Sequence, residues 1–217
     1  MKIPQHLVEK ALASAPKELT IYNRRGKPWM RLGGGNLGGF RTYYGTGSDL
    51  THTYDRRRGE LRLTLAEDIG DMAEVVEACD NIDFLMSYGI PSDVPLPKVY
   101  HHEFYQMVSR SLKPIVFTSD NGVVSKEIIS MAALIAGGKE ELKEKPFILN
   151  YSQPTSPLQH SEDALGKLFA CTDAGIPVVY PPGIMPGASA PATPAGTIIQ
   201  SLAEALFALV IHQLAAP

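Results

Sequence analysis

The sequence has few cysteines, no excess of basic residues and no long uninterrupted apolar run. Its only cysteines, Cys79 and Cys171, exclude a disulfide framework and are typical of small buried side chains in a reducing compartment. Lys and Arg number 20 against 23 Asp and Glu, a net charge of −3, so no nucleic-acid surface is expected. The run Arg56-Arg57-Arg58 is interpreted as an exposed turn.

Membrane spans and export signals are not predicted either. The longest apolar stretch, residues 198–214, is interrupted by Gln200, Glu204, His212 and Gln213, and the N-terminus is too polar for a signal peptide. The composition, 44% apolar and 20% charged, is that of an ordinary globular chain. We therefore expect a cytoplasmic protein that does not bind a membrane.

Residues 1–78 form an irregular α+β segment, which we assign as a first domain. The patterns predict a helix over residues 3–13, short strands over 19–23, 29–32 and 61–65, and a helix that Thr64 caps and that ends near residue 78. The letters Gly33-x-Gly35-x-x-Gly38 match a dinucleotide fingerprint, but aromatic residues and further glycines follow where a helix would have to begin. We interpret this stretch as a turning glycine and aromatic loop.

A regular repeat begins at residue 82. Strand-like runs start at residues 82, 114, 146 and 177, with spacings of 32, 32 and 31 residues, and a helical segment follows each run. The helices are expected over residues 101–112, 123–136, 162–174 and 194–214, with Ser161 and Thr193 as N-caps and Gly175 as a C-terminal stop. This repeat indicates parallel strands joined by crossover helices.

Four such units are half of a TIM (β/α)8 barrel, which needs eight units and ~250 residues. The predicted fold class is therefore α/β, with residues 79–217 as the first half of a barrel and the chain as a fragment. A flavodoxin-like sheet is the alternative.

The loops after the predicted strands would form the barrel mouth, where such enzymes place their active sites. These loops are rich in uncharged polar and aromatic groups, and Asp120 is their only charged residue. Such a mouth suits a ligand held by shape and aromatic faces, although rigid proline loops would also merely close the barrel. Gln200 and Glu204 share a helix face that is either solvated or turned toward the mouth. No metal-ligand cluster, HExxH motif or GxSxG motif is found.

Several segments together resemble one known family. They are KPIVFT at residues 113–118, MAALIAGG at 131–138, EKPFILNYSQPTSPL at 144–158 and the stretch 175–217. They resemble the trimethylamine methyltransferase (MttB) superfamily, which implies a TIM barrel of about twice this length. It also implies methyl transfer from trimethylamine or a quaternary amine such as glycine betaine to the Co(I) corrinoid (cobalamin) of a partner corrinoid protein.

Under this resemblance the chain binds no cofactor directly, forms a homo-oligomer when full length and is inactive as a fragment. The pyrrolysine position of the trimethylamine branch would lie beyond Pro217, and no catalytic residue is assigned. Aromatic faces would hold the cation. The substrate-binding candidates are Phe40, Tyr43, Tyr44, Tyr151, Gln153, Tyr180, Thr193, Gln200 and Glu204.

Two other functions remain open at this point. Another TIM-barrel enzyme, such as an aldolase or a decarboxylase, would carry a lysine or a carboxylate at a strand end. An inactive half-barrel that binds a partner would need no such group.

Overall fold

The computed structural model describes residues 3–34 and 41–215. At the N-terminus, α1 (Gln5–Ser14) is followed by an antiparallel hairpin of β1 (Glu18–Tyr22) and β2 (Pro28–Gly33). Gly26 turns this hairpin with a φ of 73°, a conformation that favours glycine. The predicted first helix and strand pair are thus present within one or two residues.

A second hairpin, β3 (His52–Asp55) and β4 (Glu60–Leu63), precedes α2 (Ala66–Ala78). The three arginines 56–58 are exposed in its turn, as predicted. Thr64, however, is not the N-cap of α2. The cap is Leu65, whose backbone N–H donates to the carboxylate of Asp68 at 2.8 Å, while the Thr64 hydroxyl donates to the Leu50 carbonyl.

Helices and short strands alternate in the rest of the chain. They are η1 (Leu96–Lys98), α3 (Val99–Arg110), β5 (Ile115–Phe117), α4 (Gly122–Ala136), α5 (Lys139–Glu144), β6 (Ile148–Tyr151), α6 (Glu162–Ala174), β7 (Val178–Val179) and α7 (Pro194–Ala215). Ser161 caps α6 by accepting from Ala164 N, and Gly175 ends it with a φ of 67°. The predicted start signal, Ser161, and stop signal, Gly175, are therefore both confirmed for α6.

The strands β5, β6 and β7 form a parallel sheet in that order. Isolated parallel bridges extend it, because Leu85 pairs with Ile115, and residues 45 and 50 pair with Phe84 and Gly89. Five parallel segments therefore lie side by side, and the first is residues 44–50. The regular repeat begins only at residue 82 because the hairpin β3–β4 lengthens the first unit.

This parallel pairing crosses the expected boundary between residues 78 and 79. The α/β class is confirmed, since helices and mostly parallel strands alternate along the chain.

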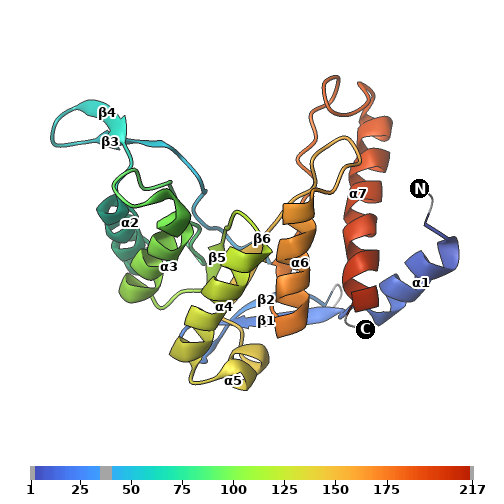
Figure 1. Cartoon of the computed structure of the whole chain (residues 1–217), viewed down its shortest axis with the longest axis horizontal. Helices are drawn as coiled ribbons and strands as arrows, with labels where there is room; N and C mark the ends of the chain where they lie inside the picture. Colours follow the sequence, from blue (N-terminus) through green and yellow to red (C-terminus); the bar gives the residue numbers. More distant parts are fainter. Residues whose placement is uncertain (1–2, 35–40, 216–217) are drawn as a thin grey trace.

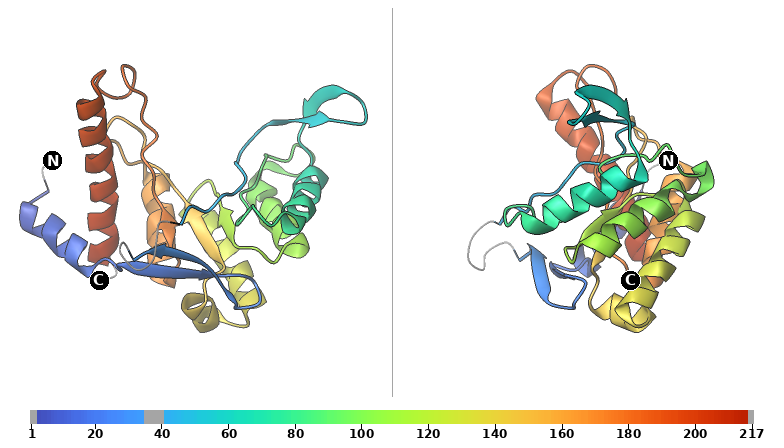
Figure 2. Two further views of the ribbon diagram at one scale, coloured as in Figure 1. Left: turned by 180° about the vertical axis from the view of Figure 1, so that it is seen from behind. Right: turned by 90° about the vertical axis from the view of Figure 1, so that its left-hand side faces the viewer.

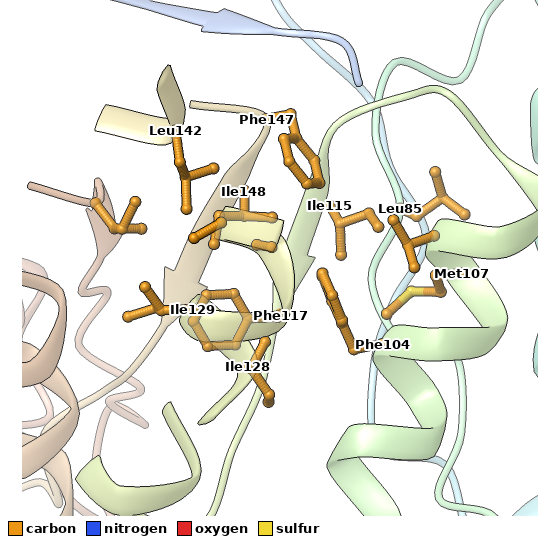
Figure 3. Close-up of a cluster of buried hydrophobic side chains, with 14 of the residues drawn as sticks. Leu85, Phe104, Met107, Ile115, Phe117, Ile128, Ile129, Leu142, Phe147 and Ile148 are labelled. Carbon is orange, nitrogen blue, oxygen red and sulfur yellow. The ribbon is translucent and has the colours of Figure 1, made fainter. Parts of the chain in front are cut away.

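Two apolar clusters cover the two faces of the sheet. One face packs against helices α3 and α4 through residues such as Ile115, Phe117 and Phe104 (Figure 3). The other face carries Val116 and Leu149, which pack against Ile21 and Met30 of the first hairpin. Successive side chains of a strand point to opposite faces of the sheet. Because these strands are nearly continuously apolar, both faces are apolar.

The first hairpin closes the N-terminal ends of the parallel segments. Backbone N–H groups of Tyr22 and Arg24 donate to the carbonyls of Pro146 and Leu112, and the Trp29 indole donates to the Asp83 carbonyl at 2.8 Å. The hairpin runs across one end of the strands while the loops after β6 and β7 rise at the other (Figures 1 and 2). The C-terminal ends of the strands are thus the open face.

Helix α7 is long and apolar enough to cross a membrane by length and composition alone. The expectation that polar residues interrupt it too often is not supported by that measure. Its Glu204 and Gln213 are nevertheless buried and bonded, with Gln213 accepting from the Ser14 hydroxyl of α1 at 2.9 Å. A single such helix is weak evidence for a membrane, and these bonds tie α7 to the rest of the chain.

Candidate active site

The residues at the C-terminal ends of the parallel segments form the candidate site. Ligands of open and closed α/β sheets bind at this end of the strands. The residues placed here are Ser87, Thr118, Asn150, Tyr151 and Tyr180. Two groups of side chains meet at this face, one of them predicted from the sequence and the other not.

The first group is centred on Glu204 of α7. Its side chain is fully buried and accepts from the Ser156 hydroxyl at 2.8 Å, from Leu158 N at 2.9 Å and from Gln200 Nε2 at 3.0 Å. Gln200 also donates to the Ser189 carbonyl at 2.8 Å. The two residues share a helix face, as predicted, and that face anchors the loops after β6 and β7 instead of being solvated.

These donors set the charge state of Glu204. Burial alone would raise its pKa, but the hydrogen bonds from Leu158, Ser156 and Gln200 outweigh burial and lower the pKa below the ordinary value. Glu204 is therefore an ionised carboxylate whose oxygens are occupied by the protein itself.

An aromatic stack lies beside this anchor. The Tyr180 hydroxyl and His160 Nδ1 are 2.9 Å apart, and the His160 ring stacks on Phe207 with centroids 3.9 Å apart. Burial lowers the pKa of His160 and raises that of Tyr180 to about 12. Tyr180 was predicted here, whereas His160 and Phe207 were not.

Tyr151 and Gln153 also lie together, because the Tyr151 hydroxyl donates to Gln153 Oε1 at 3.1 Å. Tyr151 is half-buried and packs against the same apolar cluster as Leu149. The structure thus brings Tyr151, Gln153, Tyr180, Gln200 and Glu204 to one end of the sheet.

The other predicted site residues lie elsewhere or, in the case of Thr193 in the loop after β7, have a capping role. Tyr43 packs on the first hairpin, where its hydroxyl accepts from Arg31 N at 2.9 Å, and the neighbouring Tyr44 is exposed. Thr193 accepts from Gly196 N at 3.2 Å and so caps α7. Phe40 lies outside the described residues.

The second group is acidic and corrects the prediction of an almost uncharged mouth. We call Asp49, Glu103 and Asp120 the carboxylate cluster. Asp49 Oδ1 accepts from the hydroxyls of Ser87 and Thr118, each at 3.3 Å. Ser87 and Thr118 lie at the C-terminal ends of two neighbouring parallel segments, residues 84–89 and β5. Asp49 therefore lies at the C-terminal ends of these segments.

Glu103 is the buried member of the cluster, with 2% of its surface exposed. Burial, and then the negative charge of Asp49, raises the pKa of Glu103 to about 9, against hydrogen bonds from Ser87 and Thr118 that lower it. Its Oε1 has no hydrogen-bond partner among the described residues. Glu103 is therefore a neutral acid at neutral pH.

A sequence signal for Glu103 exists. The residue stands on the buried stripe of α3, four positions after Val99 and four before Met107, where an apolar side chain is the rule. A glutamate at such a position is costly to bury unless it has a special role. Asp49 carries no such signal, because its place depends on how residues 44–50 pair with the next segment.

Other polar groups surround the carboxylate cluster. Tyr100 bonds Asp120, and burial followed by the charge of Asp120 raises the pKa of Tyr100. Lys167 donates to the Ser119 carbonyl at 3.2 Å, and burial lowers its pKa. At the end of β6, Asn150 is fully buried, and neither of its amide atoms has a partner among the described residues.

Comparison with known proteins identifies relatives along the whole chain. The model of the family described as "Trimethylamine methyltransferase (MTTB)" matches residues 1–217. A trimethylamine methyltransferase MttB of Desulfitobacterium hafniense is 32% identical over 99% of this chain and 42% of its own length. A trimethylamine methyltransferase MttB of Methanosarcina thermophila is 30% identical over the whole chain and 45% of its own length.

A glycine betaine methyltransferase from a second strain of Desulfitobacterium hafniense is 28% identical over 97% of the chain and 43% of its own length. The chain therefore spans less than half the length of the curated relatives it matches. Among solved structures, dihydropteroate synthase from Xanthomonas albilineans overlaps 84% of the chain and 73% of its own, with 15% identity and a TM-score of 0.37. That overlap is too low to define a shared fold.

Proposed function

The chain belongs to the trimethylamine methyltransferase (MttB) family, and we propose that it supplies part of the active site of a corrinoid-dependent methyltransferase. The methyl donor in this proposal is trimethylamine or a quaternary amine such as glycine betaine. The acceptor is the Co(I) corrinoid of a partner protein. The observation that carries the proposal is the pairing of aromatic side chains with buried carboxyl groups at the C-terminal ends of the parallel segments.

Methyl transfer from a methylated ammonium ion requires few catalytic groups from this chain. The nucleophile in this chemistry is the reduced cobalt that the partner carries, so the chain need not provide an activated serine or cysteine. The leaving group of a quaternary ammonium ion is a neutral amine. The chain therefore has to orient the cation and exclude water.

The aromatic residues of the site are suited to that task. The faces of Tyr151 and Tyr180 would attract the cation, each with about 0.5–2 kcal/mol. The loops after β6 and β7 rise at the open face (Figure 1). Leu158 and Met185 are exposed residues of these loops, and a partner protein approaching the open face would touch them. Glu204 would act indirectly, by holding both loops in place.

The intact protein in this proposal is a complete (β/α)8 barrel. The described part of the chain pairs β7 on one side only. Beside β7 lies a cavity of about 670 Å³, lined mainly by apolar residues of β7, α6, α7 and the end of α1. Further βα units would pair with β7, fill this cavity and cover the exposed side chains of Ile199 and Leu202 on α7.

The remaining expectations belong to the same proposal. The protein would be cytoplasmic, would act without nucleic acid or membrane and would form a homo-oligomer when full length. None of these properties is needed for the chemistry of the site.

The proposal is tested first at the DNA level and then by activity. The coding sequence is read beyond codon 217, and the whole reading frame is expressed and mixed with a reduced corrinoid protein and each amine. We expect about four further βα units by barrel size, and methyl transfer visible as a change in the corrinoid spectrum. An in-frame amber codon would select trimethylamine, and its absence a quaternary amine. A frame that ends at Pro217 and a chain that transfers no methyl group would refute the proposal.

A further inference from the structure

The carboxylate cluster contains more hydrogen-bond acceptors than donors. Asp49 and Glu103 share the hydroxyls of Ser87 and Thr118, each of which has one proton to donate, and the Tyr100 hydroxyl bonds Asp120. Oε1 of Glu103 is left without a partner although it is buried. A buried polar atom without a partner is rare in proteins and calls for an explanation.

Among the described residues, no cationic side chain bonds the unpartnered oxygen of Glu103. The ammonium group of Lys167 lies near the cluster, but it donates to the Ser119 carbonyl. On the outer side of α3, His101 pairs with Glu127 through Nε2. The cluster thus keeps the negative charge of its exposed members, Asp49 and Asp120, above the buried Glu103.

The spacing of the acidic groups disfavours a metal ion. Across residues 3–34 and 41–215, no three His, Cys, Asp or Glu side chains are grouped closely enough to hold one. A larger ion with diffuse charge tolerates wider spacing, because it is held by the field of the carboxylates and not by short coordination bonds.

We propose that the carboxylate cluster is a binding site for a methylated ammonium ion, and that this ion replaces a proton carried by Glu103 in the free protein. The choice of a methylated ion rests on the proposed function, because such an ion is the methyl donor there. The site itself rests on the unpartnered buried oxygen of Glu103 and on the charges of Asp49 and Asp120 that act on this residue.

The exchange balances in atoms and charge. Before binding, Glu103 holds its proton because it is buried next to the charge of Asp49. A cation placed between Asp49 and Asp120 offsets that charge, so the O–H bond of Glu103 ionises and the proton leaves to solvent. One positive charge enters and one leaves, and the carboxylate of Glu103 then faces the ammonium ion.

Proton release is therefore the signature that distinguishes this site. Binding of tetramethylammonium chloride and of trimethylammonium chloride to the chain is measured by isothermal titration calorimetry near pH 7, in two buffers that differ in protonation enthalpy. We expect up to about one proton released per cation bound. Potassium chloride and 3,3-dimethyl-1-butanol, an uncharged compound with a tert-butyl group of similar shape, are expected to release none.

Three variants assign the proton to Glu103. In Glu103→Gln the cation should still bind, through Asp49 and Asp120, but without proton release. Asp49→Asn should weaken cation binding and reduce the release, and it supports the test if Glu103→Gln does not fold. The matched control Glu144→Gln changes an exposed carboxylate of α5 and should behave as the unmodified chain.

Three outcomes would overturn the proposal. They are the absence of cation binding, binding without proton release, and release that persists in Glu103→Gln. Equal release with potassium chloride would overturn the assignment to a methylated ion. The proposed function fails separately, since methyl transfer by the intact protein is measured without reference to proton release.

Discussion

Two glutamates buried at the same end of the sheet differ in almost everything except burial. Glu204 has no exposed surface and Glu103 has 2%, yet the pKa of Glu204 is lowered and that of Glu103 is raised to about 9. Three donors reach the oxygens of Glu204. Glu103 has an oxygen without a partner and a negative neighbour in Asp49.

The difference shows that burial by itself does not decide whether a carboxyl group is charged. Donors aimed at the ionised form can outweigh the loss of water, and a like charge adds to that loss. Glu204 is accordingly a structural anchor for two loops, whereas Glu103 is free to exchange a proton. Five measurements test this contrast and its surroundings, beginning with the largest expected effect.

Removal of the anchor should be the most damaging change. Glu204→Ala leaves the Ser156 hydroxyl, Leu158 N and the Gln200 amide without their acceptor, so we expect the free energy of unfolding to fall by about 2–4 kcal/mol. Urea unfolding measures this loss, with Glu144→Ala as the control on an exposed helix. A loss no larger than that of the control would show that the network holds nothing in place.

The pH dependence of stability should have opposite signs at the two glutamates. The folded-state pKa of Glu103 is about 9, above its unfolded value, so its stabilising contribution is complete below the unfolded pKa and is lost as the pH rises toward 9. Glu103→Gln should remove that decline, and urea unfolding at a series of pH values measures it. Equal slopes for the two chains would contradict the raised pKa.

Glu204 should show the reverse trend. Because its pKa is lowered, its contribution is present above the ordinary value and is lost as the pH falls through the lowered one. Glu204→Gln should therefore be less stable than the unmodified chain at neutral pH and approach it in acid. A deficit that grows in acid would reverse the assignment.

A single donor to Glu204 should cost less than the whole carboxylate. Ser156→Ala removes the hydroxyl that donates at 2.8 Å, and we expect a loss of about 1 kcal/mol in unfolding free energy. The pKa of Glu204 should rise at the same time, which carboxyl-selective NMR would follow. No rise would mean that Leu158 and Gln200 suffice alone.

The smallest effect is expected in the aromatic stack. Tyr180→Phe keeps the ring but removes the hydroxyl that lies 2.9 Å from His160, so the loss of stability should stay below about 1 kcal/mol. Titration of His160 by NMR should still give a pKa below the ordinary value, because burial is its main cause. A return to the ordinary value would show that the hydroxyl keeps water from the ring.

The sequence predicted most of the elements because their signals are local. The caps Ser161 and Gly175, the apolar runs of the strands and the repeat of about 32 residues are signals between residues close in sequence. The shared face of Gln200 and Glu204 also follows from helix geometry alone. These features depend on neighbours in sequence, so one sequence is enough to predict them.

Only the tertiary structure decided what the side chains meet. Residues 44–50 become the first parallel segment by pairing with a segment some 40 residues away, which moves Asp49 beside Glu103. The proximity of Asp49, together with burial, keeps Glu103 protonated. The hydrogen bonds from the loops and from Gln200 keep Glu204 ionised. Composition and periodicity determined the α/β class and four of the five parallel segments, whereas charge state depends on distances between groups that no local pattern encodes.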